Sequence, residues 1–239
     1  CVTGKTRAIL LCNPSNPTGT VYTESELDAV AQIAVEHDLF VICDEVYREF
    51  VFGAGDVRSF TRYSDLAQRI IVVDSVSKRF NACGVRIGSL ATKNREVLDV
   101  TLRFCQARLS VATAEQLMVV PMLREGRAYS ERLCIEYEKR RDAVYAGLKL
   151  LDGVTPHLSE GSFYTMTRLP ITSCEDFAAW LLKDYSLEGR TICLAPGEGF
   201  YVTSGLGVDE VRIAFMYDAD TLTRAMKILD AAVSAYGGE

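Results

Sequence analysis

The sequence predicts an α/β fold, in which helices sandwich a mostly parallel sheet, followed by a smaller α+β domain at the C-terminal end. Three observations predict it. Short apolar runs alternate with helical patterns in the first half, these runs are apolar throughout, and the last third changes to short strands with two helices. Continuous apolar strands between helices are typical of parallel sheets covered by helices. We therefore expect a large domain over residues 1–127 and a smaller domain, opened by a long helix, over residues 128–239.

The large domain is expected to hold four strands, the first of them buried on both faces. The expected strands are Ala8–Cys12, Leu39–Cys43, Ile70–Val73 and Gly88–Thr92. Thr23 and Glu26 form the capping-box pattern that begins a helix, which runs to about His37. Another helix is expected over residues 94–107.

The rest of the chain begins with two helical patterns, over residues 114–125 and 129–151. The second is rich in charge, which is typical of a solvated helix that bridges two domains. Short strands are then expected over residues 162–167, 191–195 and 210–215. Two further helices are expected over residues 174–185 and 218–236. This mixture predicts a small α+β domain.

Composition argues against several classes of protein and site. The 239 residues carry a net charge of −6, so a surface for nucleic acid or for an anionic membrane is not indicated. No apolar run approaches the length of a membrane span. The eight cysteines include no CxxC pair, which favours reduced thiols over disulfides or zinc. We expect a cytoplasmic protein with no metal, no nucleic acid and no membrane among its partners.

Polar motifs follow three of the expected strands: Asn13–Gly19, Asp44–Tyr47 and Ser75–Lys78. Ligands of open parallel sheets bind beyond the carboxyl ends of the strands, so the three motifs would lie at one edge. Each motif alone also has an ordinary explanation. The first could be a tight turn, Asp44 a helix cap, Tyr47 a core residue and Lys78 a solvated charge.

The third motif combines phosphate-binding groups with an amine. The hydroxyls of Ser75 and Ser77 and the guanidinium of Arg86 can hold a phosphate. The amine of Lys78 could attack a carbonyl and form a Schiff base. The cofactor that offers both a phosphate and an aldehyde is pyridoxal phosphate (PLP).

With these motifs in this order, the chain resembles the PLP-dependent, fold-type I aminotransferases of class I/II. The residues that carry the resemblance are Asn16–Gly19, Asp44–Tyr47, Ser75–Lys78, Gly84, Arg86, Gly88 and Arg212. The resemblance implies transamination between an amino acid and a 2-oxo acid through a Schiff base on Lys78. Aspartate, or a general amino acid, with 2-oxoglutarate would be the default substrates.

The resemblance also implies a role for each site residue. Lys78, Asp44 and Tyr47 would be catalytic: Lys78 would carry the substrate proton, and Asp44 would pair with the pyridinium nitrogen. Tyr47 and Asn16 would hydrogen-bond the phenolic oxygen of the cofactor ring.

The remaining implied roles concern two anionic groups. Ser75, Ser77 and Arg86 would hold the cofactor phosphate. Arg212 would bind the substrate carboxylate with a bidentate fork, beside Asn16.

The chain departs from the family pattern in what precedes its first strand. Family members carry a further N-terminal region with a glycine-rich phosphate loop, an aromatic that stacks on the cofactor, and residues that complete the partner subunit's site. We therefore expect a natural N-terminus upstream of Cys1, a homodimer for the full-length protein, and little activity for this chain alone. Val85, where many relatives have an aromatic, reads as a packing variation.

Three alternatives stay open. Related class I/II enzymes use the same lysine for carbon–sulfur lysis or cyclisation, although Tyr47 favours aminotransferases because the lyases more often have histidine there. A domain of this kind can also bind PLP without catalysis and regulate a DNA-binding module. The third alternative is an inactive fragment.

Overall fold

The computed structural model describes residues 1–53 and 57–236, and the chain divides into two compact units. The first unit comprises Cys1–Ser15 and Val21–Cys134, and the second comprises Asn16–Thr20 and Ile135–Glu239. The division lies inside the long helix α5 (Arg127–Leu148), whose first residue is close to the expected domain boundary. The assignment of separate functional domains to residues 1–127 and 128–239 stays a prediction.

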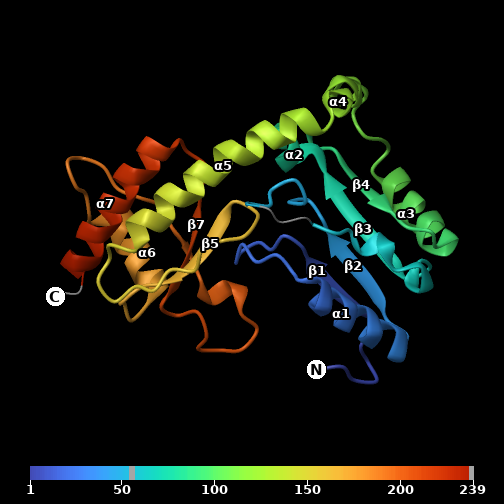
Figure 1. Ribbon diagram of the computed structural model, residues 1–239, viewed down its shortest axis with the longest axis horizontal. Helices are drawn as coiled ribbons and strands as arrows, with labels where there is room; N and C mark the ends of the chain where they lie inside the picture. The colour runs from blue at the N-terminus through green and yellow to red at the C-terminus, as the bar shows by residue number, and fades with distance from the viewer. Residues whose placement is uncertain (54–56, 237–239) are drawn as a thin grey trace. The chain divides into compact units, whose positions relative to one another are not determined.

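The first unit is built on a four-stranded sheet in the order β1-β2-β3-β4 (Figure 1). The strands are β1 (Ala8–Cys12), β2 (Phe40–Asp44), β3 (Ile70–Ser75) and β4 (Gly88–Ala91). The first three run parallel, and β4 joins β3 antiparallel. Between β3 and β4 the chain forms only the short helices α2 (Val76–Arg79) and η3 (Cys83–Val85), so it turns back instead of crossing over the sheet.

Helix α1 (Glu24–Glu36) packs on this sheet and closes its core. Thr23 caps the helix, and the expected capping box with Glu26 is present. Leu27, Ala31 and Ala34 recur at helical spacing and are buried against the strands. Cys43 lies in the same core, where burial raises the pKa of its thiol to about 12, and it therefore serves as a small apolar residue.

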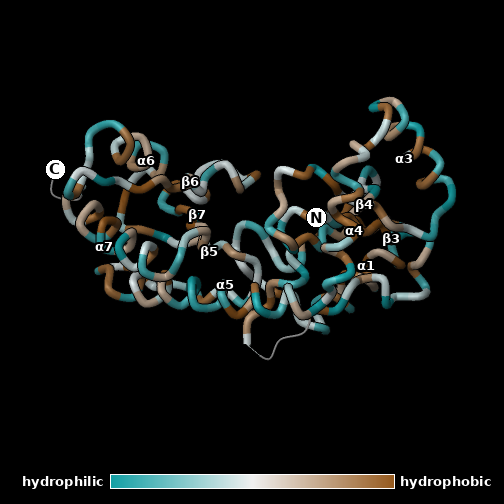
Figure 2. The backbone as a smooth tube through the Cα atoms, turned by 90° about the horizontal axis from the view of Figure 1, so that it is seen from above, coloured by the Kyte–Doolittle hydropathy of each residue, from teal (hydrophilic) through white to brown (hydrophobic). Residues whose placement is uncertain are grey.

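Several elements of the first unit carry exposed apolar residues. Leu10 in β1 is 74% exposed, so the expectation that this strand is buried on both faces is wrong for Leu10. No residue of α3 (Arg95–Ala107) is buried, although parts of this helix have the hydrophobic colour in Figure 2. Leu109, which follows it, is 87% exposed. In α4 (Thr113–Glu125), among the residues described, Val119 alone is buried. Apolar residues of this number on consecutive elements are typical of a contact surface.

The second unit contains an antiparallel sheet in the order β5-β7-β6. Strands β5 and β7 are labelled in Figure 1. Its strands are β5 (Tyr164–Arg168), β6 (Ala195–Pro196) and β7 (Glu210–Ala214). Helices α6 (Cys174–Lys183) and α7 (Ala219–Tyr236) supply buried apolar residues, including Phe177, Leu181 and Leu229. The predicted fold class, α/β with a mostly parallel sheet followed by an α+β part, is confirmed.

The strand expected over residues 191–195 is mostly wrong, because only Ala195 and Pro196 pair with β7. The Thr191 hydroxyl instead donates to the carbonyl of Leu181 at the end of α6 (2.6 Å), which ties this segment to the helix. Within the described ranges, no helix is both long enough and apolar enough to cross a bilayer.

Candidate functional site

The carboxyl ends of the three parallel strands lie at one edge of the first unit's sheet. Cys12 pairs with Asp44, and Asp44 pairs with Val73, so the three ends are in register. The N–H of Asn13, the first residue after β1, donates to the carbonyl of Asp44 (3.0 Å). The prediction that the three motifs begin at one edge is therefore confirmed.

The turn after β2 holds Asp44 in place through its own backbone. One carboxylate oxygen, Oδ1, accepts the N–H of Val46 (3.1 Å) and so holds a turn. No helix begins in residues 45–50, so the interpretation of Asp44 as a helix cap is wrong. Among the described residues, no donor to Oδ2 of Asp44 is seen, so this oxygen can serve a ligand. Tyr47 is buried in the same turn, as the core interpretation expects.

The segment after β3 brings two hydroxyls together. Ser75 caps α2, since its Oγ accepts the N–H of Ser77 (3.1 Å). The two serine Oγ atoms are 2.8 Å apart, and Ser75 Oγ is also 2.9 Å from the carbonyl of Ile87, to which it can donate. The cap therefore fixes both hydroxyls at the end of the strand.

Lys78 and Arg86 meet around Cys83. The Nζ of Lys78, which is half-buried, lies 3.7 Å from Cys83 Sγ, and this thiol donates to the carbonyl of Ser77 (3.4 Å). Arg86 has a positive φ of 58° and donates from Nη1 to the carbonyl of Cys83 (2.8 Å). Cys83 thus contacts three predicted site residues. Sequence reasoning missed it because a single cysteine in a loop has no distinguishing pattern.

This donor set fits PLP. Two hydroxyls and an exposed guanidinium suit a phosphate, an amine suits an aldehyde, and a carboxylate oxygen without a described donor suits a ring N–H. All of these groups belong to the first unit and are positioned by the ends of β2 and β3.

Arg212 lies in the second unit, on β7 between β5 and β6. Its guanidinium carbon is 4.5 Å from the ring centroid of Tyr164 and 5.1 Å from that of Phe200, so the two rings restrain the guanidinium. Its Nη1 donates to Asn16 Oδ1 (3.0 Å). Its Nε is buried without a hydrogen-bond partner in the described part of the chain, which leaves a donor for an anionic ligand.

The loop Asn16–Thr20 belongs to the same unit as Arg212, and Gly19 explains why. Gly19 has a φ of +75°, and a Cβ there would lie 2.5 Å from Ser159 Cβ and 2.7 Å from the carbonyl oxygen of Tyr164. Its own carbonyl accepts the N–H groups of Glu160 (3.0 Å) and Gly161 (2.8 Å). Only glycine can pack this closely, and the packing places Asn16 beside Arg212.

The predicted site residues therefore form two groups. One group lies in the first unit and comprises Asp44, Tyr47, Ser75, Ser77, Lys78 and Arg86. The other, Asn16 and Arg212, lies in the second unit.

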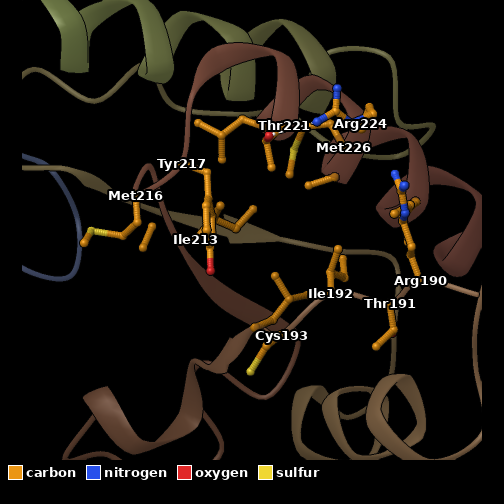
Figure 3. Close-up of a pocket in the computed structure, with 15 residues that line it drawn as sticks. Arg190, Thr191, Ile192, Cys193, Ile213, Met216, Tyr217, Thr221, Arg224 and Met226 are labelled. Carbon is orange, nitrogen blue, oxygen red and sulfur yellow. Dashed lines mark hydrogen bonds between the residues drawn. The ribbon is translucent and has the colours of Figure 1, made fainter.

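A separate cavity of about 670 Å³ lies in the second unit, between the segment 190–194 and α7 (Figure 3). Its lining is mostly apolar, with Arg190 and Arg224 as its charged residues. No predicted site residue lines it. The sequence did not predict this cavity, because residues 191–194, which help to line it, were expected to form a strand and do not pair with β7.

Comparisons with known proteins bear on both units. The family model described as "Aminotransferase class I and II" matches residues 2–229. An aspartate aminotransferase from Musicola paradisiaca is 31% identical over 99% of this chain and 58% of its own length. An aromatic-amino-acid aminotransferase from Thermococcus litoralis is 32% identical over 94% of this chain and 57% of its own length. The chain thus spans well under two thirds of these relatives.

Solved structures agree with the sequence comparison. An aromatic aminotransferase from Pyrococcus horikoshii superimposes with a TM-score of 0.87 at 29% identity, over 99% of this chain and 62% of that one. An N-succinyldiaminopimelate aminotransferase from Mycobacterium tuberculosis gives a TM-score of 0.87 at 30% identity, over 97% and 59%. Because the family model covers nearly the whole chain, the chain belongs to the class I and II aminotransferases, a fold-type I family whose cofactor is PLP.

Proposed function

We propose that this protein catalyses PLP-dependent transamination between an amino acid and a 2-oxo acid. The observation that carries the proposal is the cluster at the end of β3, where an amine, two hydroxyls and a guanidinium lie around one short helix and Cys83. Family membership supports the same chemistry.

In this proposal the residues of the first unit hold the cofactor. Ser75, Ser77 and Arg86 bind its phosphate, and the Lys78 amine bonds its carbonyl carbon. Asp44 pairs with the protonated ring nitrogen, and Tyr47 hydrogen-bonds the phenolic oxygen of the ring. When bound, the cofactor supplies an electron sink for the bond broken at the substrate Cα.

The protein's own groups move the proton and hold the substrate. Lys78 Nζ, once free of the cofactor, would carry the proton from the substrate Cα to the C4′ carbon of the cofactor, and would carry a proton in the opposite direction in the reverse half of the reaction. Arg212 binds the α-carboxylate through a guanidinium that Tyr164 and Phe200 restrain. Asn16 Oδ1 accepts a hydrogen bond from Arg212 Nη1 and so orients that fork.

The substrate pair that we propose is aspartate, or a general amino acid, with 2-oxoglutarate. Relatives named for aspartate and for aromatic amino acids support the class of substrate. Arg212 accounts for the α-carboxylate that all of these substrates share.

We further propose a cytoplasmic homodimer with no nucleic-acid partner. The exposed apolar residues of α3 and α4 support a contact with a second subunit. None of the eight cysteines forms a disulfide, which supports a reducing compartment. The net charge of −6 argues against binding to nucleic acid.

A panel of amino donors tests the function. Purified protein loaded with PLP is mixed with single amino acids, and the absorbance of the cofactor is followed. We expect a shift to the spectrum of pyridoxamine phosphate that a 2-oxo acid reverses, and no shift in a Lys78→Ala variant. Release of ammonia or thiol without pyridoxamine phosphate would identify a lyase instead, and no change with any donor would favour a regulatory role.

A further inference from the structure

We infer that Arg79, the residue after Lys78, is a positioning residue that sets where the Lys78 amine lies, through an ion network within the cofactor-binding segments. This inference rests on the proposed function, since it concerns the amine that would bond the cofactor. The network joins the turn after β2 to the end of β3 and to α2. Its members are Glu45, Arg48, Glu49, Asp74 and Arg79.

Arg79 is held by two carboxylates. Its Nη2 lies 2.5 Å from Asp74 Oδ2, and its Nε lies 3.3 Å from Glu49 Oε1. The Nε contact is an ion pair without hydrogen-bond geometry, because this nitrogen has no hydrogen-bond partner among the described residues. The Arg79 side chain is only 17% exposed, so removing the guanidinium would leave two partly desolvated carboxylates with only their longer ion pairs to Arg48.

Arg48 extends the network across the two strand ends. Its Nη1 lies 3.1 Å from Glu45 Oε2, its Nε 3.7 Å from Glu49 Oε1, and its Nη2 3.7 Å from Asp74 Oδ2. Glu45 itself is 3% exposed and immobile, since Oε1 accepts the Ser59 hydroxyl (2.7 Å) and the N–H of Phe60 (3.1 Å). The network is therefore anchored in the core of the first unit.

The order of residues along the chain explains what the network does. At the end of β2, the proposed cofactor residues Asp44 and Tyr47 are each followed directly by a network residue, Glu45 and Arg48. At the end of β3, the proposed cofactor residues Ser75, Ser77 and Lys78 lie between the network residues Asp74 and Arg79. The network thus joins the two segments that would hold the cofactor. Helix α2 has four residues and is too short to be stable alone, so its position depends on its cap and on these ion pairs.

Three variants and one control test the inference. Arg79→Met removes both ion pairs while keeping the length of the side chain, Arg79→Lys restores one charge, and Asp74→Asn removes the shorter pair from the other side. Arg62→Met is the matched control. Arg62 is 25% exposed and pairs with Glu24 (3.0 Å) and Asp28 (3.0 Å) in the same unit, but no contact links it to α2.

Two readouts separate this inference from the proposed function. The first needs no cofactor: amide hydrogen exchange of Phe80, Asn81 and Ala82, whose N–H groups bond the carbonyls of Val76, Lys78 and Ser77. The second is the visible absorbance of the protein's link to PLP, measured as its apparent affinity and as the pH at which the band changes. The full protein is used throughout.

In Arg79→Met we expect exchange of these three amides to be at least about tenfold faster, as local opening becomes easier. We also expect PLP affinity to fall roughly ten- to hundredfold, by analogy with the outer partners of metal ligands, with a shifted pH midpoint. Asp74→Asn should behave alike, Arg79→Lys should recover part of the loss, and Arg62→Met should match the wild type.

Unchanged exchange in Arg79→Met, or equal losses in Arg62→Met, would overturn the inference. Faster exchange with unchanged PLP affinity and pH midpoint would also overturn it, since Arg79 would then stabilise α2 without positioning Lys78. If the wild-type protein forms no link to PLP, the proposed function fails, and the exchange data then show whether the network still holds α2.

Discussion

Arg212 shows how one side chain is prepared for a carboxylate. The rings of Tyr164 and Phe200 restrain its guanidinium, Asn16 takes one N–H, and the buried Nε keeps a donor for a ligand. A planar fork with fixed orientation binds a carboxylate through two parallel hydrogen bonds, and a lysine cannot reproduce this geometry.

Arg212→Lys should therefore raise KM for amino acids and 2-oxo acids alike. The loss of one charge-assisted hydrogen bond, about 1.5–3 kcal/mol, predicts an increase of roughly 10- to 100-fold. Steady-state kinetics with both substrates measure it, and Arg168→Lys, an exposed arginine on the neighbouring strand β5, is the control. A loss of PLP affinity with KM unchanged would show that Arg212 binds phosphate instead.

A substitution at Asp44 can separate its two roles, the hydrogen bond to the backbone and the proposed pairing with the ring nitrogen of the cofactor. Its Oδ1 holds the turn by accepting the N–H of Val46, and asparagine can accept the same hydrogen bond. Asp44→Asn should preserve the unfolding midpoint but slow the proton-transfer step by two or more orders of magnitude, about 3 kcal/mol of barrier, because the ring nitrogen loses its anionic partner. Single-turnover absorbance measures that step. Turnover close to the wild type would reduce Asp44 to its role in the turn.

At the scale of elements, helix caps and loop packing determine where the elements begin and what they contact. Thr23 and Glu26 cap the N-terminus of α1 through reciprocal hydrogen bonds between side chain and backbone. The sequence alone predicts this cap because the two residues are only three positions apart. The loop Asn16–Thr20 is different. Its sequence reads as a tight turn, but its docking on the second unit depends on Ser159 and Tyr164, which lie far along the chain.

The capping box predicts a pH dependence. The N–H and hydroxyl of Thr23 each lie 2.8 Å from the Glu26 carboxylate and lower its pKa in the folded state. A lowered folded pKa means that this stabilisation is present above the unfolded pKa, about 4.3, and is lost as the pH falls through the folded pKa.

Glu26→Gln should consequently be slightly less stable than the wild type at pH 7, with the difference vanishing under strongly acidic conditions. Urea unfolding at both pH values measures it. A difference that is the same at both would show that the charge of Glu26 does not contribute.

Gly19→Ala tests the docking of the Asn16–Thr20 loop. A methyl group there meets Ser159 and the Tyr164 carbonyl, so the loop must shift and Asn16 must move from Arg212. We expect a loss of about 1–3 kcal/mol in unfolding free energy together with a raised KM.

Gly205→Ala is the matched control, because Gly205 has a similar φ of +82° and no atom lies within 4 Å of the place that its methyl group would take. It should cost only the backbone strain, about 1 kcal/mol, and leave KM unchanged. Equal effects of the two substitutions would mean that close packing at Gly19 is unimportant.

At the scale of the molecule, local patterns predicted most of the elements and the long-range contacts were out of reach. The apolar runs around Leu11, Val41 and Val72 gave the parallel strands and their common edge, because burial and chain direction follow from the pattern. The length of β6 was misjudged because strand propensity does not show which partner a segment meets: only Ala195 and Pro196 pair with β7, and Thr191 bonds the carbonyl of Leu181 instead.

For the candidate site, the sequence predicted the motif residues but not the residues that contact them. The motif residues could be named because each lies at a strand end, whereas Cys83, Tyr164 and Phe200 join them only through folding. An exposed apolar surface is expected for a chain that lacks the N-terminal region of its family, but its place on α3 could not be foreseen, since an amphipathic pattern does not say what the apolar face meets.

The central claim is that Lys78 is the residue that bonds PLP, and one measurement tests it directly. The PLP-loaded protein is reduced with borohydride, digested, and its peptides are mapped by mass spectrometry. We predict a stable adduct on Lys78 and the loss of that adduct in Lys78→Ala. An adduct on another residue, such as Lys93, or no adduct in a protein that binds PLP, would contradict the account.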